Sequence, residues 1–151
     1  DGRQSQRRGP AVNAAQITLV RTSSDSVRPV ATQAAAMFYD RLFERQPDVA
    51  PLFRSNMAQQ GERLMGMIAA AVDLLDQPQR LQPALAELGR RHVGYGVQAA
   101  HYDAVGHALL DTLAAALGAA FTPSHRAAWA ALYQHVSHTM QAAATAPAEA
   151  G

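Results

Sequence analysis

The spacing of prolines and glycines is the feature that most constrains how this chain can fold. Between about residue 17 and residue 140, no stretch alternates apolar and polar residues as a half-buried strand does, and good helix formers dominate. Prolines and glycines divide this region at residues 29, 47, 51, 78, 83, 94, 96, 118 and 123. The sequence therefore predicts an all-helical fold of six or seven helices joined by short corners.

Local signals place the ends of these helices. The predicted helices are a segment ending before Pro29, then about 30–46, about 57–76, a short segment ending near His92, about 99–117, and a last segment starting at Pro123. Asn56, followed three residues later by Gln59, resembles a capping box. We expect Pro78 and Pro83 to form a corner before the short helix, and Thr122 to cap the last helix.

The length of 151 residues suits one domain. We expect a flexible extension over 1–15, one folded domain over 16–142, and a flexible tail over 143–151, because both ends are polar or small and lack periodicity. The chain has no cysteine, which excludes disulfides, zinc–thiolate sites, iron–sulfur clusters and thioether-linked cofactors. A chain without thiols suits the cytosol and the periplasm alike.

The charge pattern argues against nucleic acid as a partner. The net charge is +1, all thirteen cations are arginine, and only Arg3, Arg7 and Arg8 lie close together in the sequence. The longest fully apolar run, 67–72, is too short to span a bilayer, and no signal-peptide core precedes residue 17. The sequence predicts a soluble, cytoplasmic protein with no membrane partner, and it leaves the oligomeric state open.

Four helices each place one hydrogen-bonding side chain on an apolar face. Residues three or four apart share a helix face, which puts Tyr39, Gln60, His92 and Tyr102 on apolar stripes. The stripe around Gln60 consists of Met57, Leu64, Met67, Ile68 and Leu75. Buried polar groups need partners, so these four side chains are expected to converge on a common site.

Simpler interpretations remain open for each residue taken alone. A tyrosine on a core face usually packs its ring and leaves its hydroxyl at the rim, and a single histidine is more often a core residue than a ligand. Gln60, one turn into its helix, is equally compatible with a half-exposed position. His135 and His138 have a spacing that suits a metal, but no carboxylate lies nearby in the sequence, which favours a solvated face.

Five segments, taken in order, resemble the globin family. They are MFYDRLFERQPDVAPLF, QQGERLMGMI, LGRRHVGYGV, HYDAVGHALLDTLAAALG and FTPSHRAAWAALYQHV, within roughly residues 17–140. The chain is most similar to single-domain bacterial globins related to flavohaemoglobins and neuroglobins. The resemblance implies a three-on-three helical sandwich around one haem b, held without a covalent bond because the chain has no cysteine.

On the distal side of the haem, the resemblance implies roles for five residues. Tyr39 matches the distal tyrosine of bacterial globins, and Gln60 matches the residue above the iron. Leu64 matches the apolar residue that bounds the distal pocket, and Phe53 matches the phenylalanine that wedges against the haem. Arg63 occupies the position from which a cation reaches a haem propionate.

On the proximal side, His92 matches the histidine that binds the iron and is the expected metal ligand. Leu88, one turn earlier on the same stripe, is expected to contact the haem. Val97 matches a residue beneath the porphyrin, and Tyr102 matches the proximal tyrosine of flavohaemoglobins. These assignments account for all four inward polar side chains.

Three departures from the family pattern bear on these expectations. No flavin reductase module follows the helical domain in this sequence. The stretch QAAATA lacks the carboxylate that polarises the proximal histidine in flavohaemoglobins, so we expect His92 to donate to a neutral acceptor such as a backbone carbonyl. The first helix reads RTSSDS where many relatives have a tryptophan, which predicts different local packing.

The resemblance implies reversible binding of a diatomic gas (oxygen, carbon monoxide or nitric oxide), with oxygen binding, transport or storage as the leading function. An amide at Gln60 and a phenol at Tyr39 can both donate hydrogen bonds to a polar gas ligand. One alternative is oxidation of nitric oxide to nitrate with an external reductase. Another is a haem-based redox or gas sensor.

Overall fold

The computed structural model describes residues 12–53, 56–94 and 97–145, and all regular secondary structure within these ranges is helical. The helices are α2 (Ala14–Val27), α3 (Ala31–Arg45), α4 (Met57–Asp73), α5 (Pro78–Gly94), α6 (Ala99–Leu117) and α7 (Pro123–Thr145), with the short 3₁₀ helices η1 (Arg28–Val30), η2 (Pro47–Leu52) and η3 (Gly118–Ala120). The all-helical prediction is confirmed. Within the described ranges, no helix combines the length and apolar character that a membrane span requires.

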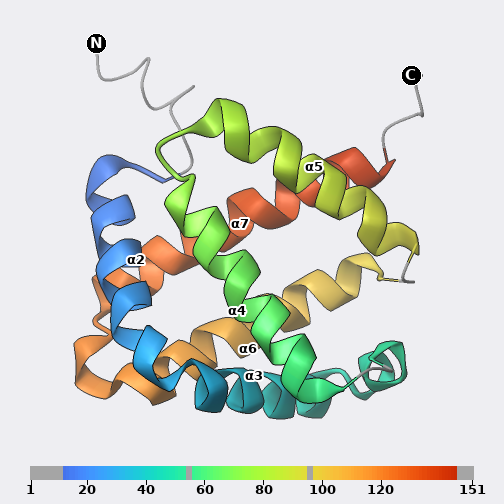
Figure 1. The fold of residues 1–151 in the computed structure, drawn as a ribbon, viewed down its shortest axis with the longest axis horizontal. Helices are drawn as coiled ribbons and strands as arrows, with labels where there is room; N and C mark the ends of the chain where they lie inside the picture. The colour runs from blue at the N-terminus through green and yellow to red at the C-terminus, as the bar shows by residue number, and fades with distance from the viewer. Residues whose placement is uncertain (1–11, 54–55, 95–96, 146–151) are drawn as a thin grey trace.

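The helices form the expected three-on-three sandwich, in which α2, α4 and α5 lie across α3, α6 and α7 (Figure 1). The most extensive packing joins α5 to α7 and α3 to α6. Helix α2 also packs on α7, and α4 packs on α3. Consequently α5 takes its position from the last helix of the chain, whereas α4 takes its position from α3.

Helix α2 begins two residues before the predicted start of the folded domain. Asn13 caps it: the Asn13 side chain accepts from the Gln16 backbone N–H at 2.8 Å, and the Gln16 side chain accepts from the Asn13 N–H at 3.1 Å. Val12 is buried in the core. Order therefore reaches back to residue 12, inside the segment expected to be flexible, while residues 1–11 lie outside the described residues.

Local signals determine both ends of the loop between α6 and α7. Helix α6 spans the predicted residues and stops at Gly118, whose φ of 56° is a conformation that side-chain-bearing residues rarely adopt. Helix α7 begins at the predicted Pro123, where the Thr122 hydroxyl oxygen accepts from the His125 backbone N–H at 3.3 Å. Helix α7 continues to Thr145, past the expected end of the domain at 142, and residues 146–151 lie outside the described residues.

The start of α4 agrees with the sequence, but its end does not. The Asn56 side chain accepts from the backbone N–H groups of Ala58 and Gln59, at 2.8 and 3.2 Å, so Asn56 is the helix cap. The helix ends at Asp73, three residues before the expected end. Leu75 is still buried, which shows that the apolar stripe runs on into the turn after the helix.

The prediction of a corner at Pro78 and Pro83 was wrong, because one helix, α5, contains both residues. Pro78 stands at the first position, where no backbone N–H is needed. Pro83 lies inside the helix, where it lacks a hydrogen-bond donor. Leu81 and Leu85 flank Pro83 and are both buried, so the packing of this face outweighs the missing hydrogen bond.

A serine and a tryptophan occupy the centre of the contact between α2 and α7. Trp129 is 2% exposed, and its indole Nε1 donates to the Ser23 hydroxyl at 2.8 Å. The Ser23 hydroxyl donates in turn to the Leu19 carbonyl at 2.6 Å. The large aromatic ring at this contact comes from the last helix. From the sequence RTSSDS of the first helix we expected only that the local packing would differ.

Helices α5 and α7 cross at Gly89, where a Cβ atom would collide with the backbone of Met140. We predict that Gly89→Ala lowers the free energy of unfolding by about 1–3 kcal/mol, because backbone cannot move aside as a flexible side chain can. Gly66→Ala is the matched control: no atom lies within 4 Å of a Cβ there, and the change should stabilise by roughly 0.5–1 kcal/mol. Urea unfolding of both variants measures the difference, and equal effects would contradict the close crossing.

Candidate functional site

His92 lies in the last turn of α5 with its imidazole half-buried. The ring Nδ1 is 2.8 Å from the carbonyl oxygen of Leu88, one turn earlier on the helix. A carbonyl oxygen only accepts, so Nδ1 carries a proton and donates it. The acceptor is the neutral backbone carbonyl that the sequence led us to expect. This hydrogen bond fixes the orientation of the ring.

The carboxylate of Glu87, which is close to His92 in the sequence, is engaged elsewhere. It lies 3.1 Å from the Arg90 guanidinium and 3.6 Å from that of Arg91, and all three side chains are exposed. Pairs of this kind contribute little to stability. They direct the Glu87 carboxylate toward two cations on the surface of α5.

An apolar groove of about 200 Å³ lies between α4 and α5. Its lining consists of Met67, Ala70, Ala71, Leu74, Leu81, Ala84, Leu85, Leu88 and Arg91. Every lining residue except Arg91 is apolar, and Leu88 is also the residue whose carbonyl holds His92. Arg91, which the sequence analysis did not single out, places a cation at the groove beside His92.

Large apolar side chains are exposed on α4 and α5, which border this groove, and on η2. Met57 and Met67 of α4 are 38% and 41% exposed, although the sequence predicted both on an inward stripe. Val93 of α5 is 53% exposed and Leu52 of η2 is 37% exposed. Of these four side chains, Met67 lines the groove itself.

A cluster of aromatic rings brings three of the predicted distal residues together. Tyr39, Phe53 and Leu64 belong to one apolar cluster, which is contributed by α3, η2, α4 and α6. The ring centroids of Tyr39 and Phe53 are 5.2 Å apart in an edge-to-face arrangement. Phe43 contacts both rings, at 5.9 and 5.6 Å. We call the whole apolar cluster that contains Tyr39, Phe53 and Leu64 the Tyr39 cluster.

The hydroxyl of Tyr39 points to the fourth predicted distal residue. It donates to the backbone carbonyl of Gln60 over 3.4 Å, which is long for a hydrogen bond from a hydroxyl group. Gln60 lies in the first turn of α4 and is half-buried, which is the alternative that the sequence had left open. Arg63, one turn along α4, is exposed to solvent.

Three of the four predicted proximal residues, all except His92, belong to a second apolar cluster among the described residues. Tyr102 is buried there, with Leu88 and Val97 packed against the cluster. Burial raises the pKa of Tyr102 above its ordinary value. The Tyr102 backbone carbonyl accepts from the Tyr133 hydroxyl at 2.6 Å, which ties the start of α6 to α7. The two sets of predicted residues thus occupy two different clusters.

His101 is a positioning residue that the sequence analysis missed. It is 4% exposed, its Nδ1 accepts from the Gln98 backbone N–H at 3.0 Å, and its Nε2 donates to the Asp48 carboxylate at 3.1 Å. Hydrogen bonds from the Gln46 side chain and from His101 lower the pKa of Asp48. The histidine thereby links the start of α6 to η2, the element that precedes Phe53. The spacing of Gln98 and His101 at a helix start was the available signal.

Comparison with known proteins identifies similar chains. A family model described as Globin matches residues 36–140. A flavohemoprotein from Bordetella parapertussis is 35% identical over 99 residues, which cover 64% of this chain and 25% of that protein. A neuroglobin from Tetraodon nigroviridis is 32% identical over 136 residues, covering 81% of this chain and 86% of that protein.

A flavohemoprotein from Vibrio cholerae is 31% identical over 112 residues, covering 72% of this chain and 28% of that protein. The chain therefore spans only about a quarter of the length of the flavohemoproteins it matches. It corresponds to most of the length of the neuroglobin.

Burial raises the pKa of Tyr39 from 10.0 to about 12. Because the folded state holds this proton more tightly, Tyr39 contributes stability below pH 10 that is lost as the pH rises through 12. We predict that the difference in tyrosinate absorbance between the native protein and Tyr39→Phe shows a phenol titrating near pH 12. A difference spectrum whose titration midpoint equals that of free N-acetyltyrosinamide would contradict the burial of this hydroxyl.

Proposed function

Because this chain belongs to the globin family, we propose that it binds one haem b non-covalently at the groove between α4 and α5, with His92 as the iron ligand, and reversibly binds oxygen. The observation that carries this proposal is the hydrogen bond from His92 Nδ1 to the Leu88 carbonyl, 2.8 Å long, beside an apolar groove. The absence of cysteine leaves no thiol for covalent attachment. When bound, the haem supplies a ferrous iron that takes a diatomic gas.

The residues at the groove suit a porphyrin. A porphyrin is flat and mostly apolar, with two carboxylates at one edge, and eight of the nine groove residues are apolar. Covering exposed Met67 and Val93 contributes about 25 cal/mol for each Å² of apolar surface removed from water. Arg91 at the groove and Arg63 on α4 are the cations available to the carboxylates.

The neutral acceptor on His92 favours reversible gas binding over oxidative chemistry. A histidine that donates to a carboxylate becomes a more electron-rich ligand, which promotes oxidation at the iron. Here the acceptor is the Leu88 carbonyl, and Glu87 is paired with Arg90 and Arg91. This arrangement supports binding and storage of oxygen, with carbon monoxide and nitric oxide as further ligands.

The similarity to flavohemoproteins supports a second candidate function, the oxidation of nitric oxide to nitrate. That reaction needs electrons, and a separate flavin reductase would be the partner that supplies them. A third candidate is a redox or gas sensor in which Tyr39 or Gln60 responds to the ligand. The neutral acceptor on His92 places both behind the oxygen-binding function.

We predict that His92→Ala abolishes most haem affinity, because it removes the only side chain proposed to bind the iron. Titration of the purified chain with haem, followed by its Soret absorbance, measures this. His138→Ala is the matched control, since His138 is exposed on α7. Added imidazole should restore part of the spectrum, and acid acetone should extract the haem from the native protein. Unchanged affinity in His92→Ala would refute the assignment.

Tyr39→Phe tests the distal residues. The present hydrogen bond to Gln60 is long, so the hydroxyl can turn to donate to a polar ligand. Its removal should cost roughly 1–3 kcal/mol, the range for hydrogen bonds to strongly polarised groups, or about a 5- to 150-fold faster oxygen dissociation. Carbon monoxide is a poorer hydrogen-bond acceptor, so its dissociation rate should change much less. Stopped-flow rates that change equally for both gases would show that Tyr39 acts only by its size.

A further inference from the structure

His101 joins two of the elements that build the Tyr39 cluster. Val49 of η2 and Ala104 of α6 are buried members of this cluster. Asp48 immediately precedes Val49, and His101 lies one turn before Ala104. The hydrogen bond from His101 Nε2 to the Asp48 carboxylate, 3.1 Å long, therefore crosses from α6 to η2 beside buried cluster residues on both elements.

Backbone packing holds η2 mainly to α3. Within the described part of the chain, η2 packs extensively on α3, and α6 is not among the elements that pack extensively on η2. The Asp48 carboxylate supplies a link to both helices. One of its oxygens accepts from the Gln46 side chain at 2.7 Å, and the other accepts from His101. Gln46 caps the end of α3, so Asp48 connects that end, η2 and the start of α6.

The imidazole of His101 is neutral in this arrangement. Its Nδ1 accepts from the Gln98 backbone N–H at 3.0 Å, so Nδ1 carries a lone pair and the proton is on Nε2. Residue 48 must therefore supply an acceptor oxygen, but it need not supply a charge. The imidazole is buried, and an Nε2–H group without a partner would lose its hydrogen bond to water without replacing it. The contact with Asp48 thus favours one position of η2 relative to α6.

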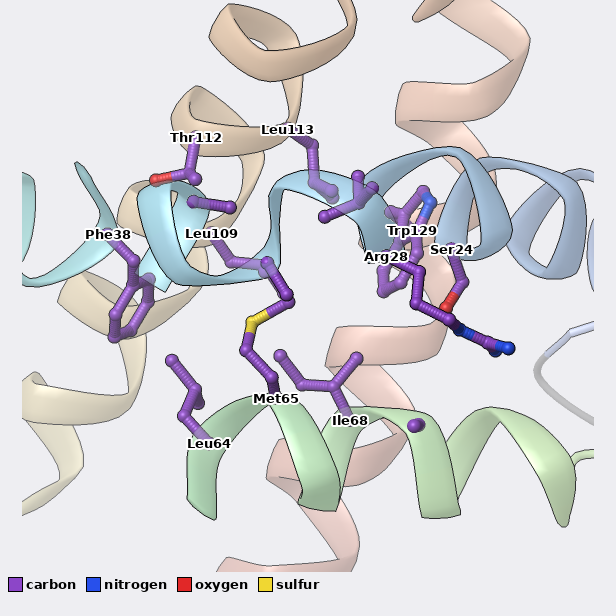
Figure 2. A pocket seen from close by; sticks show the side chains of 14 residues that line it. Ser24, Arg28, Phe38, Leu64, Met65, Ile68, Leu109, Thr112, Leu113 and Trp129 are labelled. Atoms are coloured by element: carbon purple, nitrogen blue, oxygen red, sulfur yellow. The ribbon is translucent and has the colours of Figure 1, made fainter. Parts of the chain in front are cut away.

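Phe53 connects η2 to Tyr39. It follows η2 directly, and its ring is in edge-to-face contact with the Tyr39 ring. Tyr39 also contacts Phe38, with ring centroids 5.1 Å apart. Phe38 and Leu64 line a pocket of about 80 Å³ (Figure 2), so other side chains do not confine the Phe38 ring on every side. The position of the Tyr39 ring therefore depends on Phe53, and the position of Phe53 depends on η2.

The hydroxyl of Tyr39 is held only loosely by its own hydrogen bond, which spans 3.4 Å to the Gln60 carbonyl, so the packing of the ring determines where the hydroxyl points. We propose that His101 is a positioning residue for Tyr39. Its hydrogen bond to Asp48 holds η2 in place, and η2 holds Phe53 against the tyrosine ring. The positioning is independent of any ligand. Its effect on gas binding rests on the proposed function, in which Tyr39 donates to bound oxygen.

Substitutions of Asp48 test the positioning in the full chain without any need for haem. Asp48 is exposed, so Asp48→Ala should fold while removing the acceptor, and the ring-proton NMR resonances of Tyr39 and Phe53 should shift. Asp48→Asn keeps an acceptor oxygen and should retain the native resonances. Asp111→Ala is the matched control, because it removes a different link of α6, the 2.9 Å ion pair with Arg45 of α3. It should leave both rings unshifted.

The nitrogen resonances of His101 give a second measurement in the same samples. They should show the proton on Nε2 in the native chain and in Asp48→Asn, and Asp48→Ala should shift the Nε2 resonance. Unshifted rings of Tyr39 and Phe53 in Asp48→Ala would overturn the proposal. Equal ring shifts in Asp48→Asn and Asp48→Ala would also overturn it, because they would show that the charge of residue 48, and not a hydrogen bond from a neutral imidazole, holds η2.

Oxygen kinetics test the consequence for ligand binding. In the haem-loaded protein, Asp48→Ala should release oxygen roughly fivefold faster, the lower limit expected for Tyr39→Phe, because the hydroxyl is misplaced and not removed. In the Tyr39→Phe background, Asp48→Ala should add nothing, since two changes that act through one hydroxyl are not additive. An unchanged rate, or an equal acceleration in both backgrounds, would overturn the action through Tyr39. Because the NMR measurements need no haem, failure of the haem proposal is distinguishable from failure of the positioning proposal.

Discussion

The packing of α5 against α7 is the constraint on which the rest of the structure depends. Gly89 lets the two backbones approach at Met140, and the buried Leu81 and Leu85 hold the first turns of α5 to the core. Helix α4 is held instead by α3. Because different partners support the two helices, their facing surfaces need not close on each other, and an apolar groove remains between them.

Because α4 and α5 pack on different helices, the candidate site residues lie in two different environments. The Tyr39 cluster is built by α3, η2, α4 and α6, whereas His92 stands on α5, where Leu88 packs against the larger core. Each environment supplies a different kind of hydrogen bond. The imidazole donates over a short 2.8 Å to a fixed carbonyl, while the phenol donates over a long 3.4 Å to one. The shorter hydrogen bond holds the imidazole more firmly than the longer one holds the phenol.

Much of this arrangement could be predicted from the sequence, because local chemistry determines it. Asn56, Gly118 and Thr122 mark helix ends that the structure confirms, and the i−4 carbonyl offered to His92 follows from helix geometry. What could not be predicted depends on distant packing. Pro83 inside α5 is tolerated only because its neighbours are buried, and the contact of His101 with Asp48 joins residues 53 positions apart. The Met67 side chain follows the helical period but faces a groove. Hydrophobic periodicity alone does not distinguish a side chain that faces a groove from one that faces the core.

The deepest packing of the molecule lies away from the groove. The largest fully buried side chains, Val20, Leu42 and Trp129, come from α2, α3 and α7, and none of them lines the groove. A groove ligand therefore does not contact these three side chains, whereas Leu81 and Leu85 belong both to the core and to the groove lining. The ligand then adds stability by mass action, in proportion to the logarithm of its free concentration over its dissociation constant. A larger supply of a ligand that fills the groove would consequently raise the free energy of unfolding of the chain.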